Sequence, residues 1–193
     1  INTNETVYFV RHVEAHPGTN FDNGNYVCQG QWRAIGSPAI LLNKIGGSLP
    51  DLVYSSDPSE SYGGVAFPFT YVRPSLTINP FTIKYNMPMN LVSASQARWS
   101  NYESMAQFFF TGQSFTNKTI LVAWEHGNIQ SAVNYLVSTI YNQPELASQI
   151  PEWAYNDYDS IWKVQINAQG QMTFSNSCEG IPSAQLPMNC PNF

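Results

Sequence analysis

The chain has 193 residues, with 8 Lys and Arg side chains against 13 Asp and Glu, which gives a formal net charge of −5. Charged residues make up 11% of the chain, whereas aromatic residues reach 14%; soluble domains usually carry roughly 25% charged residues. An acidic chain without a basic cluster is not expected to bind nucleic acid or an anionic membrane, and its aromatic content excludes a disordered chain. At roughly 100–200 residues per domain, we expect one domain spanning residues 1–193.

The first part of the chain predicts two short strands with a helical segment between them. Residues 6–10 (TVYFV) are β-branched and aromatic, which is typical of a buried strand. A polar loop rich in Gly, Asn and Pro follows over residues 17–25. Residues 29–44 have a helical pattern in which Pro38 either interrupts the helix or starts a second one. Residues 52–55 predict the second strand, and residues 57–74 predict a loop and a helix.

The second part predicts two helices, one strong strand and a hairpin. We expect a helix over 94–110, a strand over 119–124 (TILVAW), and then a helix whose N-cap is Asn128. Residues 161–166 and 172–174 predict a β-hairpin. Strands that alternate with helices indicate an α/β fold, a three-layer sandwich with a mostly parallel central sheet.

The cysteines and the composition bear on the compartment. Cys178 and Cys190 enclose a proline-containing tail, so we expect a disulfide between them that pins the C-terminus and leaves Cys28 free; three reduced cysteines in a cytoplasmic protein are the alternative. Few lysines and two glycosylation-type triplets, at Asn4 and Asn117, favour a periplasmic or secreted protein. Because the chain begins at Ile1, we expect that an upstream segment has been removed. No apolar run approaches the ~18 residues of a membrane helix.

Two of the three histidines follow predicted strands. His12 closes the first strand beside Arg11, and His126 follows residues 119–124 and opens a helix. Ligands of open α/β sheets bind beyond the carboxyl ends of the strands, and a helix N-terminus presents free N–H groups to anions. The two histidines therefore predict an anion pocket, with two ordinary polar loop residues as the alternative.

These segments resemble a known family. Residues 7–14 (VYFVRHVE) resemble the Arg-His-Gly-Glu motif of the histidine phosphatase (phosphoglycerate mutase-like) superfamily, and residues 121–127 (LVAWEHG) resemble its second histidine motif. Residues 53–58 are similar to the strand end that precedes the family's second pocket arginine, and residues 30–34 to the helix start after its first motif. The matches follow the family's order from residue 7 to about 140.

The chain also departs from the family's pattern. Val13 stands where the motif has glycine, and the nearest candidate for the second arginine, Arg73, comes later than usual. Gly127, instead of the Asp of the acid phosphatase branch, follows His126, and no cap insertion is evident. The chain therefore looks like the smaller, phosphoglycerate mutase-like branch.

The resemblance implies a set of residue roles. His12 would be the nucleophile that takes the phosphoryl group as a phosphohistidine, and Arg11, Arg73 and His126 would surround the phosphoryl oxygens. Glu125 is the preferred proton donor, ahead of Glu103. The candidate substrate-binding residues, some at the pocket mouth and Glu14 behind it, are Glu14, His16, Asn20, Asn25 and Glu103.

No cofactor or metal is expected for this chemistry. His12 and His16 are four residues apart, but that spacing joins two ligands only on a helix, and this segment leaves a strand. Arg33 and Arg98 are expected at the surface or in ion pairs.

The expected function is hydrolysis of a phosphorylated small molecule through a phosphohistidine. A phosphomutase and a non-catalytic phosphate-recognising protein on the same fold are the alternatives. A mutase needs a lid that protects the phosphoenzyme from water, and a pinned tail over residues 175–193 favours hydrolysis instead. The sequence has no feature that bears on oligomeric state.

Overall fold

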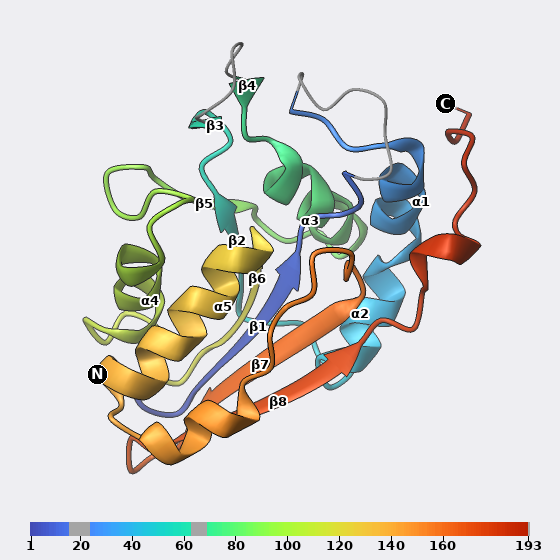
Figure 1. Ribbon diagram of the computed structural model, residues 1–193. Coiled ribbons are helices and arrows are strands. Elements are labelled where there is room, and N and C mark those ends of the chain that lie inside the picture. The colour runs from blue at the N-terminus through green and yellow to red at the C-terminus, as the bar shows by residue number, and fades with distance from the viewer. Residues whose placement is uncertain (16–23, 63–68, 193) are drawn as a thin grey trace.

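The computed structural model describes residues 1–15, 24–62 and 69–192, and a six-stranded sheet forms its centre (Figure 1). The strand order is β5-β2-β6-β1-β7-β8. Four neighbouring strands are parallel, namely β5 (Asn90–Val92), β2 (Leu52–Ser56), β6 (Thr119–Trp124) and β1 (Glu5–Arg11). The antiparallel hairpin of β7 (Ser160–Ile166) and β8 (Met172–Cys178) extends the sheet beside β1. A separate small ladder joins β3 (Ser61–Tyr62) to β4 (Phe69–Thr70).

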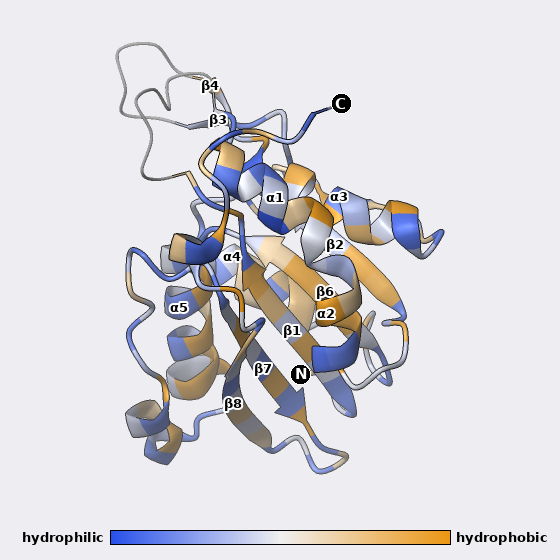
Figure 2. Ribbon diagram, turned by 90° about the vertical axis from the view of Figure 1, so that its right-hand side faces the viewer, coloured by the Kyte–Doolittle hydropathy of each residue, from blue (hydrophilic) through white to orange (hydrophobic). Residues whose placement is uncertain are grey.

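Helices cover both faces of the sheet (Figure 2). One face carries α1 (Cys28–Gly36), α2 (Pro38–Lys44) and α3 (Arg73–Lys84), and the other carries α4 (Tyr102–Phe110) and α5 (His126–Tyr135). A π-helical turn (Leu136–Ile140) and two 3₁₀ turns (Pro144–Gln149 and Ser183–Gln185) complete the helical segments among these residues. None of the described helices is long and apolar enough to cross a membrane.

The side chains of a strand point alternately to the two faces of the sheet, which explains why helices cover both faces. Val7 and Phe9 of β1 belong to the apolar core under α4 and α5, whereas Tyr8 and Val10 belong to the core under α2 and α3. Successive side chains of a strand point to opposite faces, so a strand that is apolar throughout requires two covering layers. This arrangement confirms the predicted α/β sandwich with a mostly parallel central sheet.

The sequence predicted most elements, but it did not predict the short strands β3, β4 and β5, and two helices differ from the expectation. Residues 29–44 form two helices, because Pro38 starts α2 at a position where its missing N–H costs nothing. The helix expected over 94–110 begins only at Tyr102, where the side chain of Asn101 accepts a hydrogen bond from the Ser104 N–H. The described part of residues 57–72 contains no helix; α3 begins at Arg73, with Pro74 in its first turn.

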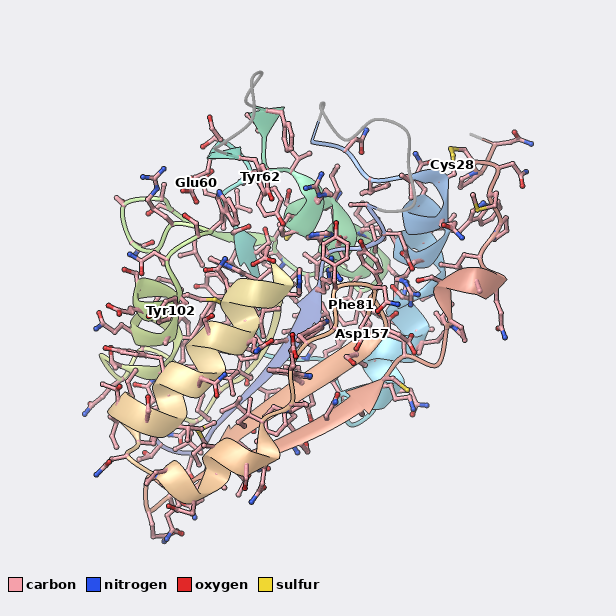
Figure 3. All side chains as sticks on the ribbon, in the orientation of Figure 1. Cys28, Glu60, Tyr62, Phe81, Tyr102 and Asp157 are labelled. Atoms are coloured by element: carbon pink, nitrogen blue, oxygen red, sulfur yellow. A yellow bond between two sulfur atoms is a disulfide. The ribbon has the colours of Figure 1, made fainter. Side chains whose placement is uncertain are left out.

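The predicted disulfide is wrong in its pairing. Cys28 is bonded to Cys190, and Cys178 is an exposed free thiol at the end of β8. The C-terminal tail runs beside α1 (Figure 1), and Cys28 at the start of α1 lies next to it (Figure 3). Trp32 Nε1 donates to the Asn189 carbonyl at 2.7 Å along the same contact. The tail is therefore pinned as expected, but by the cysteine most distant in sequence.

Candidate active site

The two strand-end histidines come from neighbouring parallel strands. β1 and β6 pair in a register that sets Arg11 opposite Trp124, so His12 and His126 leave the sheet at the same carboxyl edge. A small pocket of about 80 Å³ opens there. Its described lining consists of Arg11, His12, Ala15, Tyr62, Tyr71, Arg73, Glu125, His126 and Tyr155.

His12 is buried and held in one tautomer. Its Nδ1 lies 2.8 Å from the carbonyl oxygen of Val13, and because a carbonyl only accepts, Nδ1 carries the proton and Nε2 the lone pair. Burial lowers the pKa of His12 well below its usual 6.5, and the charges of Arg11 and Arg73 lower this pKa further. The ring is therefore neutral near pH 7, with a nitrogen free to act as a nucleophile.

The two pocket arginines lie among carbonyls and aromatic rings. Arg11 donates to the carbonyl oxygens of Tyr155 (2.6 Å) and Asp157 (3.1 Å), and its guanidinium carbon lies 3.8 Å from the centre of the Tyr158 ring. Arg73, the first residue of α3, donates to the Asn25 carbonyl at 3.3 Å.

Neither of these arginines forms an ion pair with a carboxylate in the described part of the chain. The Nε of each is buried and has no hydrogen-bond partner among these residues. A buried cation that is not paired with a carboxylate is costly, and Glu125, which also lines this pocket, is bound to the N–H groups of α5. Two such cations at one pocket indicate a binding site for an anion.

Glu125 caps helix α5 and borders His126. Its carboxylate accepts hydrogen bonds from the N–H groups of Gly127 (2.9 Å) and Asn128 (2.7 Å), so Glu125, and not the predicted Asn128, is the N-cap. Nδ1 of His126 lies 2.8 Å from Glu125 Oε1, without the alignment of a directed hydrogen bond. Burial alone would raise the pKa of Glu125, but the adjacent His126 ring and these N–H groups lower it to about 2.

The other sequence candidates lie elsewhere. Glu14 is fully buried behind the pocket and bound to Arg33. Glu103 is exposed on α4 and does not line the pocket. Asn25 meets Arg73 through its backbone carbonyl. His16 and Asn20 lie outside the described residues.

Sequence reasoning missed the tyrosines of the pocket. Tyr62, Tyr71 and Tyr155 come from three separate segments and match no motif. The high aromatic content of the chain was the available signal, but composition does not say which rings meet.

Comparison with solved structures identifies the fold. The protein histidine phosphatase SixA in complex with tungstate is similar with a TM-score of 0.56 and 12% identity, over 90% of this chain and 97% of that one. Phosphoglycerate mutase from Plasmodium falciparum is similar with a TM-score of 0.52 and 17% identity, over 100% and 99% of the two chains. No family model and no curated protein sequence matches the chain. The chain therefore has the phosphoglycerate mutase-like fold. In this structure His12 and His126 lie at the carboxyl edge of the sheet, as the sequence predicted.

Proposed function

We propose that this protein hydrolyses phosphomonoesters through a phosphohistidine on His12. The observation that carries the proposal is the neutral His12 ring, with its Nδ1 proton held by Val13, in a small pocket shared with two arginines that lack carboxylate partners among the described residues. The similarity to a histidine phosphatase and to a phosphoglycerate mutase supports the same chemistry.

The first step forms the covalent intermediate. Nε2 of His12 attacks phosphorus, the bond from phosphorus to the ester oxygen breaks, and the alcohol leaves. Arg11 and Arg73 stabilise the charge on the phosphoryl oxygens, which is the main requirement of phosphoryl transfer. In the second step water attacks phosphorus and returns a proton to the group that protonated the alcohol, the nitrogen–phosphorus bond breaks, and inorganic phosphate and neutral His12 are released.

The leaving oxygen needs a proton, and we propose that His126 supplies it. The sequence favoured Glu125 as the donor, but a carboxylate with a pKa of about 2 and two helix N–H groups on its oxygens holds no proton near neutral pH. Nδ1 of His126 lies 2.8 Å from the Glu125 carboxylate, which would stabilise a positive charge on this ring. A proton on the ring could then pass to the alcohol.

The experiment compares two substrates with different leaving groups. p-Nitrophenolate leaves without a proton, whereas an alkyl alcohol needs one, so His126→Gln should lose about 10²-fold more activity on an alkyl phosphate than on p-nitrophenyl phosphate. His12→Ala should be inactive on both. Absence of phosphate release by the wild-type protein across pH 4–9 would overturn the hydrolase proposal, and equal losses in His126→Gln would remove His126 as the donor.

Hydrolysis is preferred over mutase activity because of the tail. The disulfide from Cys28 to Cys190 and the bond from Trp32 to Asn189 fasten this segment to α1. A fastened segment is poorly suited to open and close over a phosphoenzyme.

A further inference from the structure

A second and larger cavity adjoins the phosphate pocket. It measures about 450 Å³, and its described lining comes from residues 155–159 and from Pro182, Ser183 and Ala184 in the tail. Tyr155 lines both cavities. Tyr155 is 63% exposed although its ring centre lies 6.1 Å from that of His126.

Arg11 fixes the loop that separates the two cavities. It donates to the backbone carbonyls of Tyr155 and Asp157, and its guanidinium lies over the Tyr158 ring. Figure 3 shows Asp157 near the carboxyl end of β1, on the loop before β7. Arg11, which would bind the phosphate, therefore also holds Tyr155 and Tyr158 in place beside the larger cavity. This cavity is placed to receive the group that is attached to the phosphate.

The larger cavity offers aromatic and apolar surface, and its acidic side chains are engaged in the protein. Asp157 accepts hydrogen bonds from the N–H groups of Asp159 and Ser160. Asp159 accepts from Arg33 and from the Ile181 N–H. These two carboxylates leave the cavity negatively biased, which disfavours an incoming anion.

The four arginines leave no cation for a second anionic group. All eight Lys and Arg residues of the chain fall within the described ranges, so each can be placed. Arg11 and Arg73 line the phosphate pocket. Arg33 is 1% exposed and bound to Glu14, Glu179 and Asp159. Arg98 pairs with Glu60 and lines neither cavity.

The four lysines lie away from both cavities. Lys44 and Lys84 are in the last turns of α2 and α3, and Lys118 directly precedes β6. Helices that connect parallel strands end at the amino edge of the sheet, opposite the pocket. Lys163 lies within β7, with its Nζ 5.7 Å from the Tyr8 ring centre.

We propose that the cavity beside Tyr155 binds the alcohol part of the substrate, and that this part is an uncharged group with an aromatic ring. The proposal rests on the proposed hydrolase function and narrows it. A second phosphate or a carboxylate on the substrate would meet Asp157 and Asp159, and no Lys or Arg is among the described lining residues. An aromatic ring would instead stack on Tyr155 beside the phosphoryl group, within reach of Tyr158.

The test uses three alkyl phosphates whose alcohols have comparable acidity. Benzyl phosphate carries a ring, glycerol 3-phosphate is small and uncharged apart from its phosphate, and 3-phosphoglycerate carries a carboxylate. We expect kcat/KM for benzyl phosphate to exceed that for glycerol 3-phosphate by about tenfold, and 3-phosphoglycerate to be the slowest. Hydrolysis of all three without this order, or with 3-phosphoglycerate fastest, would overturn the inference while the hydrolase function stands. Hydrolysis of none would overturn the proposed function itself.

Two variants locate the preference in the cavity. Tyr155→Ala should reduce the ratio of kcat/KM for benzyl phosphate to that for glycerol 3-phosphate about 3- to 10-fold, and Ala184→Trp, which fills the cavity from the tail, should reduce the same ratio. Tyr102→Ala is the matched control, because Tyr102 is an exposed tyrosine on α4, well apart from Asp157 (Figure 3). An unchanged ratio in both cavity variants, with thermal unfolding like that of the wild type, would contradict the proposal.

Discussion

Glu14 and Arg33 form an ion pair that is sealed from solvent. Nε of Arg33 lies 2.7 Å from Oε1 of Glu14, and the two side chains are 1% and 0% exposed, respectively. Arg33 also binds Glu179 at 2.6 Å, and the Ser183 hydroxyl donates to Glu14 at 2.8 Å. The residue two positions after the proposed nucleophile is thereby tied to the C-terminal tail, so pocket and tail form one structural unit.

Removal of Arg33 should destabilise the fold strongly. Arg33→Met leaves Glu14 and Glu179 buried without their cation, which should lower the free energy of unfolding by about 3–5 kcal/mol. The matched control is Arg98→Met, because the ion pair of Arg98 with Glu60 involves a side chain that is 67% exposed, and such pairs contribute about 0–1 kcal/mol. Urea unfolding followed by circular dichroism measures both, and equal losses would show that the buried pair adds nothing specific.

The disulfide between Cys28 and Cys190 should stabilise the fold, whereas the third cysteine, Cys178, should contribute no such stability. The disulfide closes a loop of 162 residues, and removing a native disulfide usually costs roughly 2–5 kcal/mol. Cys190→Ser should therefore lower the unfolding midpoint, whereas Cys178→Ser, at an exposed free thiol, should not. Peptide mapping without reduction checks the pairing directly, and a peptide linking Cys178 to Cys190 would contradict it.

Glu125 should affect activity as well as helix stability. Glu125→Ala removes the N-cap of α5, and Asn101→Ala removes the N-cap of α4; each should cost about 0.5–2 kcal/mol. Loss of Glu125 also frees His126, and misplacement of a catalytic group can cost about 10²-fold in rate. Thermal unfolding and kcat/KM for an alkyl phosphate are measured on both variants. If Asn101→Ala is as inactive as Glu125→Ala, the effect is general destabilisation.

Glu5 should make the protein less stable as the pH rises. Its carboxyl is fully buried, both oxygens lack hydrogen-bond partners among the described residues, and burial raises its pKa to about 8 from the usual 4.5. Between these two values the folded state holds a proton that the unfolded state has lost, so this part of the stability is complete below about pH 4.5 and is lost as the pH rises through 8.

Glu5→Gln should remove that dependence. We expect the variant to be more stable than the wild type at pH 8 by a few kcal/mol, on the order of 1.4 kcal/mol per unit of pKa shift, and much closer to it at pH 5. Glu179, whose pKa burial raises to about 7, acts in the same direction, so the comparison is between variant and wild type at each pH. Parallel stability curves from pH 5 to 8 would show that Glu5 is ionised in the fold.

Local patterns predicted the sheet and the two histidines. The strand that contains Val7 to Val10 can be recognised in the sequence, because a strand buried on both faces must be apolar at successive positions. His12 directly follows this strand, β1, and His126 follows β6 after one residue, so their shared edge follows from the parallel pairing of β1 and β6. The helix of residues 73–84 was not predicted, since Pro80 and its polar residues weaken the helical pattern.

Local sequence patterns were sufficient to predict the α/β class, three of the four parallel strands and the positions of His12, Arg11 and His126, because each depends on residues close together in the chain. Only the tertiary structure decided that Arg73 enters the pocket, that Cys28 bonds Cys190, that Glu125 is an ionised helix cap, and that Tyr155 lies between two cavities. Each of these depends on contacts between segments far apart in sequence. Such contacts form only when folding brings the segments together, where burial and hydrogen bonding then stabilise them.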